Sequence, residues 1–270
     1  MPRTIVALAA VALLVACGAR KSGQVTVSAA STAATGGSTT TPPPAPAALP
    51  AGVRITEVNV AVRELELSDG TCASSGDGSK VSQASRDSSG PGDSSGGHDG
   101  SDDGECEAEV GPFIAHLDAA ALADLAAGRV PQVWSAPLRA GTYSELEVQL
   151  CAVDPASLAD EAQAALATAM QGATVVVKGT YQPQGAESAA PFTISVSACA
   201  ELERHVRITV DDQGAVSNLT VSLPLGNWFR DAAGNPIDPT TDAGAAAIAA
   251  GIAASLDVCG DDDRDGHSDD

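Results

Sequence analysis

The stretch that decides the fold is residues 53–67, which read Val-Arg-Ile-Thr-Glu-Val-Asn-Val-Ala-Val-Arg-Glu-Leu-Glu-Leu. Apolar residues alternate with polar ones along it, as in a β-strand that has one buried and one exposed face. The alternation slips twice, because Ile55 and Val58 are three positions apart, and so are Val62 and Leu65. A slip of one residue turns the side chains to the wrong face, so we expect a β-bulge or a short bend at each place.

Further stretches carry the same strand signal, as alternation or as a short apolar run, and turn residues separate them. They are residues 110–117, 130–138, 146–150, 175–181, 192–196, 206–210 and 219–223. Short strands at such spacing predict a mainly β protein whose antiparallel strands form a sandwich or a closed sheet. Helical stretches begin at the capping residues Asp118, Asp154 and Asp242, and we expect one or two Ala-rich helices beside the sheets.

The N-terminus has the pattern of an export signal. Residues 5–16 are an uninterrupted run of small and aliphatic residues behind Arg3. The run has the length of a signal-peptide core and is shorter than the about 18 to 20 apolar residues that cross a bilayer. Its end, Leu-Val-Ala-Cys at positions 14–17, resembles the lipobox of bacterial lipoproteins. The resemblance implies that residues 1–16 are removed and that Cys17 carries fatty acids such as palmitate. The alternative is an ordinary secretory signal with an incidental cysteine.

Three segments are too polar and too rich in small residues to bury a core. Residues 17–50 are mainly Ser, Thr, Ala, Gly and Pro and predict a disordered tether. Residues 69–107 predict a disordered acidic insertion between two strands, and residues 259–270 predict an acidic tail. The remaining chain, residues 51–258, is expected to fold as a single β-sandwich domain.

The charge of the chain argues against some partners. A net charge of -21 disfavours nucleic acid, because no basic face offsets the repulsion of the phosphates. We expect the membrane, reached through the lipid on Cys17, to be the partner. The expected location is the bacterial cell envelope, at the outer membrane. Aromatic residues make up only 3% of the chain, so a carbohydrate-binding groove has few candidate platforms. They are Trp134, Trp228, Tyr143 and Tyr181.

Five cysteines follow the one in the lipobox, and none of them lies in a CxxC or Cys/His metal pattern. Disulfides are therefore expected in an oxidising compartment. Cys72 and Cys106 flank the acidic insertion, whereas Cys151 and Cys199 each end a strand-like run. These four residues are the candidates for two bridges. Cys259 either stands outside the bridges or displaces one of their members, and spacing alone does not settle the connectivity.

Two chemical patterns have simple structural explanations. Gly-Asp-Ser-Ser-Gly at positions 92–96 matches the nucleophile motif Gly-x-Ser-x-Gly. Its Gly/Ser/Asp surroundings cannot hold a serine within reach of a base, so we do not expect catalysis there. His116 and His205 lie on or near strands and are expected to be structural. The neighbouring carboxylates Glu145 and Glu147 are expected on the solvent side of an alternating strand.

The acidic tail carries the sharpest chemical signal. Its aspartates follow the spacing of the first nine positions of an EF-hand loop, with Gly266 at the tight turn. The ligand at the twelfth position is missing, so the alternative is a solvated acidic tail. The expected Ca²⁺ ligands are Asp261, Asp263, Asp265 and Asp269, with the main-chain carbonyl of His267.

Several segments together resemble an uncharacterised bacterial lipoprotein family, catalogued as a domain of unknown function. They are residues 58–67, residues 116–128 and residues 138–146, where the turn Ala-Gly-Thr-Tyr follows Arg139 in place of the family's usual proline. Residues 227–239 and the Asp-rich end are also similar to relatives of this group. The likeness covers roughly residues 53–150. It implies a secreted β-sandwich of the prealbumin or immunoglobulin type with no known activity, so no catalytic residue is carried over.

These features predict a cell-envelope lipoprotein with a binding or structural role that is not an enzyme. No cofactor is expected apart from the Ca²⁺ of the tail. The alternatives are a solute- or carbohydrate-binding surface protein and a weak calcium-binding envelope protein. A cluster of Trp134, Trp228 and Tyr181 on one exposed face favours sugar binding, whereas their burial favours a structural domain.

Overall fold

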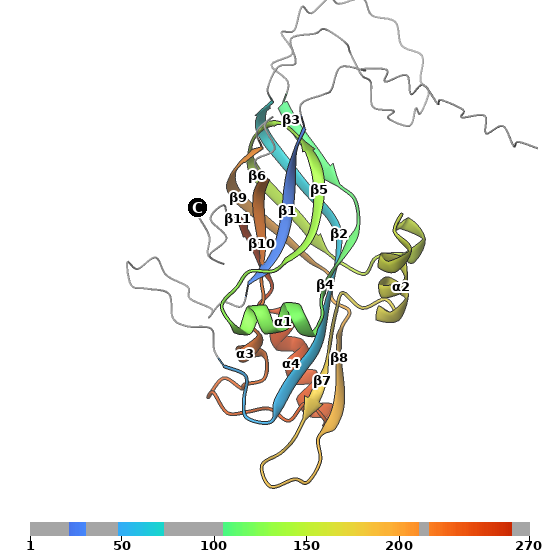
Figure 1. Ribbon diagram of the computed structural model, residues 1–270, viewed down its shortest axis with the longest axis vertical. Helices are drawn as coiled ribbons and strands as arrows, with labels where there is room; N and C mark the ends of the chain where they lie inside the picture. The colour runs from blue at the N-terminus through green and yellow to red at the C-terminus, as the bar shows by residue number, and fades with distance from the viewer. Residues whose placement is uncertain (1–21, 31–47, 73–104, 211–215, 261–270) are drawn as a thin grey trace, which may run out of the picture.

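The computed structural model describes residues 22–30, 48–72, 105–210 and 216–260, and it is mainly β, as predicted. The smaller sheet has the strand order β11-β10-β1-β5, and the larger has the order β8-β7-β2-β6-β9, with β3 and β4 also paired to β2. The predicted β-sandwich is confirmed (Figure 1). The strands are β1 (Ser22–Ala30), β2 (Val53–Cys72), β3 (Glu105–Val110), β4 (Phe113–Leu117), β5 (Gln132–Arg139), β6 (Gly141–Leu150), β7 (Val175–Tyr181), β8 (Ala190–Val196), β9 (Ala200–Val210), β10 (Val216–Ser222) and β11 (Asp257–Gly260).

Strand β2 organises the larger sheet because it runs the whole length of the domain (Figure 1). It pairs with β7 and then β6 along one edge, and with β4 and then β3 along the other. Its register against β7 shifts between Ile55 and Glu57, and its register against β6 shifts between Val62 and Glu64. Both predicted bulges are confirmed. They return the apolar side chains to the core, namely Ile55, Val58, Val60, Val62, Leu65 and Leu67.

Both flanks of the sandwich are bridged by side chains. On one flank β5 lies beside β3 and β4, and the rings of Phe113 and Trp134 stack with their centroids 4.2 Å apart. On the other flank β11 lies beside β9, and Arg204 Nη2 contacts Asp257 Oδ1 at 2.7 Å. One continuous hydrophobic core therefore fills the space between the sheets.

Tyr143 marks the place where the chain leaves one sheet for the other. Strand β5 belongs to the smaller sheet and β6 to the larger, and only Ala140 separates them. The ring of Tyr143 is fully buried, and its hydroxyl donates a hydrogen bond to the carbonyl oxygen of Arg139 at 2.8 Å. Burial raises the pKa of this phenol. The Ala-Gly-Thr-Tyr turn thus fixes a corner of the sandwich.

The helices close one end of the sandwich and cover part of one outer face. At the lower end in Figure 1 lie α1 (Ala119–Ala126), α3 (Leu225–Trp228) and α4 (Asp242–Ala253), and α2 (Glu161–Met170) lies on the outer face of the larger sheet. Asp118 caps α1 as expected. The helical stretch that begins at Asp154 is instead split into a 3₁₀ turn (Pro155–Ser157) and α2, because Asp160 caps a second start by accepting from the amide of Gln163.

The prediction that residues 17–50 form a tether is wrong for residues 22–30. These residues form β1, which lies inside the smaller sheet between β10 and β5. Val25 and Val27 are buried in the core. The alternate residues Thr26 and Ser28 are also buried, and both hydroxyls donate to Asn218 Oδ1. Small hydroxyl residues give the segment the composition of a linker, but paired hydroxyls are compatible with burial.

Two predicted boundaries also need correction. Strand β2 continues through Cys72 and β3 begins at Glu105, so the ends of the expected insertion at 69–107 are strand residues that pair with each other. Strand β11 includes Cys259 and Gly260, so the expected tail at 259–270 begins with two strand residues paired to β10. In both places a neighbouring strand supplies main-chain partners that composition does not reveal.

Candidate functional site

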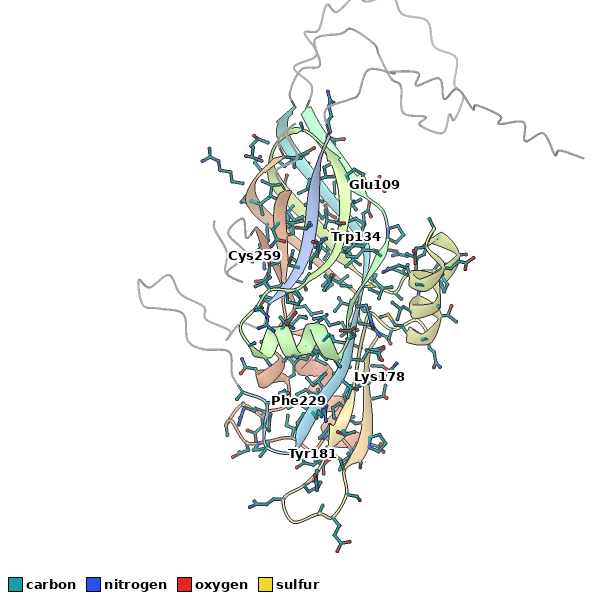
Figure 2. The ribbon with its side chains drawn as sticks, in the orientation of Figure 1. Glu109, Trp134, Lys178, Tyr181, Phe229 and Cys259 are labelled. Carbon is teal, nitrogen blue, oxygen red and sulfur yellow. A yellow bond between two sulfur atoms is a disulfide. The ribbon has the colours of Figure 1, made fainter. Side chains whose placement is uncertain are left out.

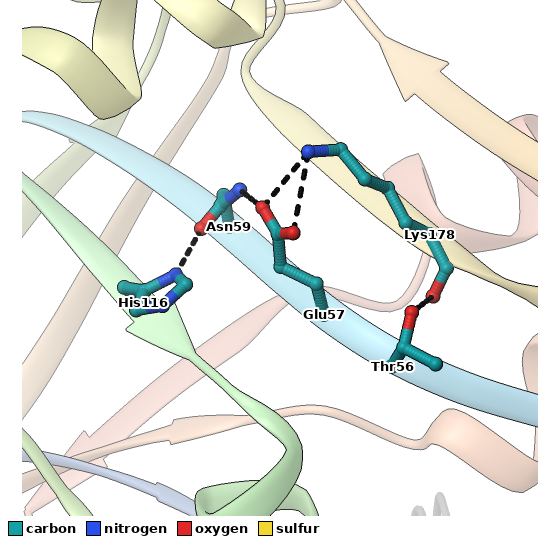
Figure 3. A network of polar contacts seen from close by, with 5 residues as sticks. All are labelled: Thr56, Glu57, Asn59, His116 and Lys178. Carbon is teal, nitrogen blue, oxygen red and sulfur yellow. Dashed lines mark hydrogen bonds and ion pairs between the residues drawn. The ribbon is translucent and has the colours of Figure 1, made fainter.

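A polar network on the outer face of the larger sheet joins β2, β4 and β7 (Figure 3). Lys178 Nζ lies 3.0 and 3.2 Å from the two carboxylate oxygens of Glu57. Asn59 donates from Nδ2 to Glu57 Oε1 at 2.7 Å, and Asn59 Oδ1 lies 2.6 Å from His116 Nδ1. Asn59 is buried, and both ends of its amide are paired. The expectation that His116 is a structural histidine agrees with this contact.

The charged groups of the network are paired within it, because the ammonium group of Lys178 contacts the carboxylate of Glu57. Burial by itself would raise the pKa of Glu57, but the hydrogen bonds from Asn59 and Lys178 and the positive charges of Lys178 and His116 hold this pKa below its ordinary value. The carboxylate is therefore ionised and paired with an ammonium group. Such a pair presents no activated nucleophile and no unpaired base.

The network lies at the first bulge of β2, and this position indicates a role in holding β2 against β7. Thr56 is the extra residue of that bulge, and its hydroxyl donates to the carbonyl oxygen of Lys178 at 3.3 Å. The side chain of Lys178 returns to Glu57, the next residue of β2. The network thus holds the register between β2 and β7 where the ladder is interrupted.

Helix α2 covers another part of this outer face, over β2 and β4. Gln163 accepts from the amide of Ile114 at 2.5 Å and donates to the carbonyl oxygen of the same residue at 3.1 Å. The side chain therefore satisfies the main chain of β4 as a neighbouring strand would. Beneath the helix lies a second hydrophobic cluster that contains Ile114, Ala167, Met170 and Val176. The bonds of Gln163 to β4 and the packing against this cluster indicate a structural role for α2.

A row of glutamates crosses the larger sheet above the network. Glu66 lies opposite Glu109 on one side and Glu147 on the other, and Glu147 lies opposite Glu203. We call these four residues the acidic row. Partial burial and the negative charges of its neighbours, chiefly Glu147, raise the pKa of Glu66. Like charges directly opposite one another destabilise a sheet, so the row weakens the fold locally.

Metal binding has little support among the described residues. They contain no group of three or more His, Cys, Asp or Glu side chains that could hold a metal ion. The expected Ca²⁺ ligands in the tail lie outside the described residues, as do Cys17 and the motif at 92–96. His205 is exposed on β9. Calcium binding by the tail therefore stays a prediction.

One of the two expected disulfides is confirmed. Cys151 and Cys199 are bonded, with their Cα atoms 4.5 Å apart, and they extend the ladder in which Leu150 of β6 faces Ala200 of β9. Cys259 thus does not displace either of them, and its Sγ lies 3.8 Å from the carbonyl oxygen of Thr220. Cys72 and Cys106 lie on paired strands, β2 and β3, but their side chains are outside the described part of the structure.

The aromatic side chains do not gather on one exposed face. Trp228 is buried and donates from Nε1 to Ser255 Oγ at 2.8 Å. Trp134 is half-buried against Phe113, and Tyr181 is half-buried against the core at the far end of the molecule (Figure 2). The exposed cluster that would favour sugar binding is therefore not formed by these three residues, and Trp228 alone meets the burial criterion for a structural domain.

The alternation in residues 53–67 predicts that Glu57 and Asn59 lie on an outward face, but it does not predict their partners. The partners come from β4 and β7, and the register that brings them together depends on the bulge. Within the described ranges, no helix has the length and apolar character to cross a membrane. No protein-family model matches the chain, and neither does any curated protein or solved structure. The resemblance to a lipoprotein family therefore stays a prediction.

Proposed function

We propose that this chain is a lipid-anchored protein of the bacterial cell envelope, with a sandwich domain that has a binding or structural, non-enzymatic role. The observation that carries the proposal is the apolar run of residues 5–16, which ends in Leu-Val-Ala-Cys at positions 14–17. Membership of the uncharacterised lipoprotein family and location at the outer membrane are parts of the same proposal.

The disulfide supports export. A bridge between Cys151 and Cys199 is stable in an oxidising compartment and rare in a reducing cytosol. The bond lies at the junction of β6 and β9, so it also reinforces the ladder that carries the acidic row. An exported chain gains this reinforcement only after it has left the cytosol.

The side chains support a role other than catalysis. The most connected polar cluster, around Glu57 and Asn59, is internally paired and holds the register of β2. Trp228 is buried, and Trp134 packs against Phe113. The polar groups of this cluster and the two tryptophans are therefore occupied by structural contacts.

Acylation of Cys17 is the direct test. Cells that express the chain are labelled with radioactive fatty acid, and the chain is isolated from the membrane fraction. The Cys17→Ala variant is expected to lose the label and to stay as the uncleaved precursor or become soluble. A Cys259→Ser variant is the matched control and is expected to keep the label. Label that persists on the Cys17→Ala chain overturns the proposal.

Weak calcium binding by the tail is a second proposal, carried by the alternate aspartates that begin at Asp261. The missing twelfth-position ligand predicts a dissociation constant of about 10⁻⁴ to 10⁻³ M, as in extracellular modules. Calorimetry at millimolar Ca²⁺ compares the chain with one that ends at Gly260, the last residue of β11. Binding heat is expected from the longer chain only, and equal heats overturn this proposal.

A further inference from the structure

The start of β1 lies close in sequence to the proposed lipid. Ser22 is the first residue of β1, and Cys17 precedes it by five residues. Five residues span at most about 18 Å even when fully extended. A lipid on Cys17 therefore holds the first residue of a central strand near the bilayer surface, where a long tether was expected from residues 17–50.

Several strand ends meet where β1 begins. Ser22 lies opposite Arg139, the last residue of β5. Gly141, the first residue of β6, lies opposite Cys72 at the end of β2 and opposite Val210 at the end of β9. We call this end of the sandwich, at the top of Figure 1, the proximal end. The helices α3 and α4 and the turn between β7 and β8 lie at the opposite, distal end.

We propose that the proximal end faces the lipid bilayer and that the sandwich stands on the membrane with its long axis away from it. This inference rests on the proposed acylation of Cys17. Strand β2 runs from the distal to the proximal end, and its 20 residues span at most about 66 Å at 3.3 Å per residue. The distal end is therefore presented tens of ångströms from the head groups.

Basic residues lie next to the proposed lipid in the sequence, and the acidic insertion joins β2 to β3 at this same end of the sandwich. Arg20 and Lys21 lie between the lipidated cysteine and β1 in the sequence, and Arg139 is exposed beside the first residue of β1. The partner of this end is a lipid bilayer, which the short link from Cys17 to Ser22 holds beside it.

The acidic row does not oppose this orientation. Glu66 lies six residues before Cys72 on β2, which places the row about 20 Å from the proximal end at 3.3 Å per residue. Charges separated by more than about 8 Å of physiological salt solution are largely screened. Repulsion between the acidic row and the head groups is therefore small, and the acyl groups on Cys17 hold the proximal end at the bilayer.

Energy transfer to labelled lipids tests the orientation. The acylated chain is reconstituted in vesicles of phosphatidylethanolamine and phosphatidylglycerol that contain a head-group-labelled acceptor lipid. A genetically encoded fluorescent amino acid replaces either Pro137, exposed near the proximal end, or Ser188, exposed in the distal turn. Transfer is expected from position 137 and is expected to be lost at position 188.

A linker variant is the matched control. Twenty Gly/Ser residues are inserted between Lys21 and Ser22, and the two ends of such a linker lie about 25 Å apart on average. This insertion is expected to reduce the transfer from position 137. Mass spectrometry of each intact chain reports its acylation. Equal transfer from both positions of an acylated chain, or no effect of the linker, overturns the orientation and leaves the anchor standing. A chain without acyl groups overturns the anchor and the orientation together.

Discussion

Glu66 lies at the centre of a local electrostatic conflict. Glutamates from both neighbouring strands, Glu109 and Glu147, lie directly opposite it. Glu57, on the same strand, has the opposite environment, because Lys178 and Asn59 both donate to its carboxylate. The pKa of Glu66 is therefore raised and the pKa of Glu57 is lowered. Residues of one type on one face of one strand thus act on stability in opposite directions.

The first prediction is that Glu66→Gln stabilises the domain. The substitution removes one charge from the acidic row and keeps a side chain of similar size. We expect a gain of about 0.5 kcal/mol in the free energy of unfolding at pH 7, within the range of cross-strand pair energies. Urea unfolding followed by circular dichroism measures it. The control is Glu187→Gln in the exposed turn between β7 and β8, which is expected to change little.

The same comparison at several pH values tests the cause. Because the pKa of Glu66 is raised in the folded state, the folded chain holds this proton more tightly than the unfolded chain. Stability from this group is therefore lost as pH rises from the ordinary carboxyl pKa through the raised one. The advantage of Glu66→Gln is expected to vanish at a pH below both values. An advantage that is the same at every pH contradicts the electrostatic explanation.

The second prediction concerns Thr174, a buried residue beside the second hydrophobic cluster. Its hydroxyl is the one fully buried side-chain oxygen without a hydrogen-bond partner among the described residues. Thr174→Val replaces it with a methyl group of similar shape and is expected to stabilise the domain by about 1 kcal/mol. Thr193→Val, on the exposed face of β8, is the control in the same urea titration. A destabilised Thr174→Val chain shows that the hydroxyl has a partner.

At the scale of the elements, a strand with strong alternation was predictable, and a strand with the composition of a linker was not. The two phase slips in residues 53–67 placed both bulges of β2 correctly. Strand β1 was not predicted, because the residues on the side away from Val25 and Val27 carry small hydroxyl groups and few of its residues are large and apolar. Its composition is therefore that of a linker. What makes β1 a strand is its parallel pairing with β10, some 190 residues away in the chain, and its bonds to Asn218. No local pattern contains such a partner.

The third prediction is that β1 is essential to the fold. A chain that begins at Ser31 lacks the buried side chains of Val25 and Val27 and leaves Asn218 without its two hydroxyl donors. Each valine contributes about 1.5 to 3 kcal/mol by burial, and β5 and β10 also lose their shared neighbour. We expect this chain to be unfolded at 25 °C by circular dichroism. A chain that begins at Ser22 is the control and should melt as the chain that begins at Cys17 does. Equal melting of both chains would restore the tether interpretation.

At the scale of the whole molecule, the sandwich class was predictable but its closure was not. Alternating strands with intervening turns require two packed layers, which the structure has. The flank contacts of Phe113 with Trp134 and of Arg204 with Asp257 join residues whose approach depends on the crossing of the sheets. The Cys151–Cys199 bridge was predictable because both cysteines end strand signals. The network around Asn59 was not, since it depends on the register of three strands at once.

The last prediction concerns the segment between β2 and β3. The composition of residues 74–103, rich in Ser, Gly and Asp, predicts that they contribute to stability through their length alone. Thr71 pairs with Glu105, so a four-residue Gly/Asn turn can replace the segment without moving either strand. This change shortens the loop between Thr71 and Glu105 from 33 to 7 residues, about fivefold. It is expected to change the free energy of unfolding by at most about 1.5 kcal/mol, on the stabilising side, because closure entropy grows only logarithmically. A chain with a Gly/Ser segment of the original length in place of residues 74–103 is the control, and it is expected to match the native chain in thermal and urea unfolding. A loss of several kcal/mol in both variants shows that the native residues pack against the sandwich.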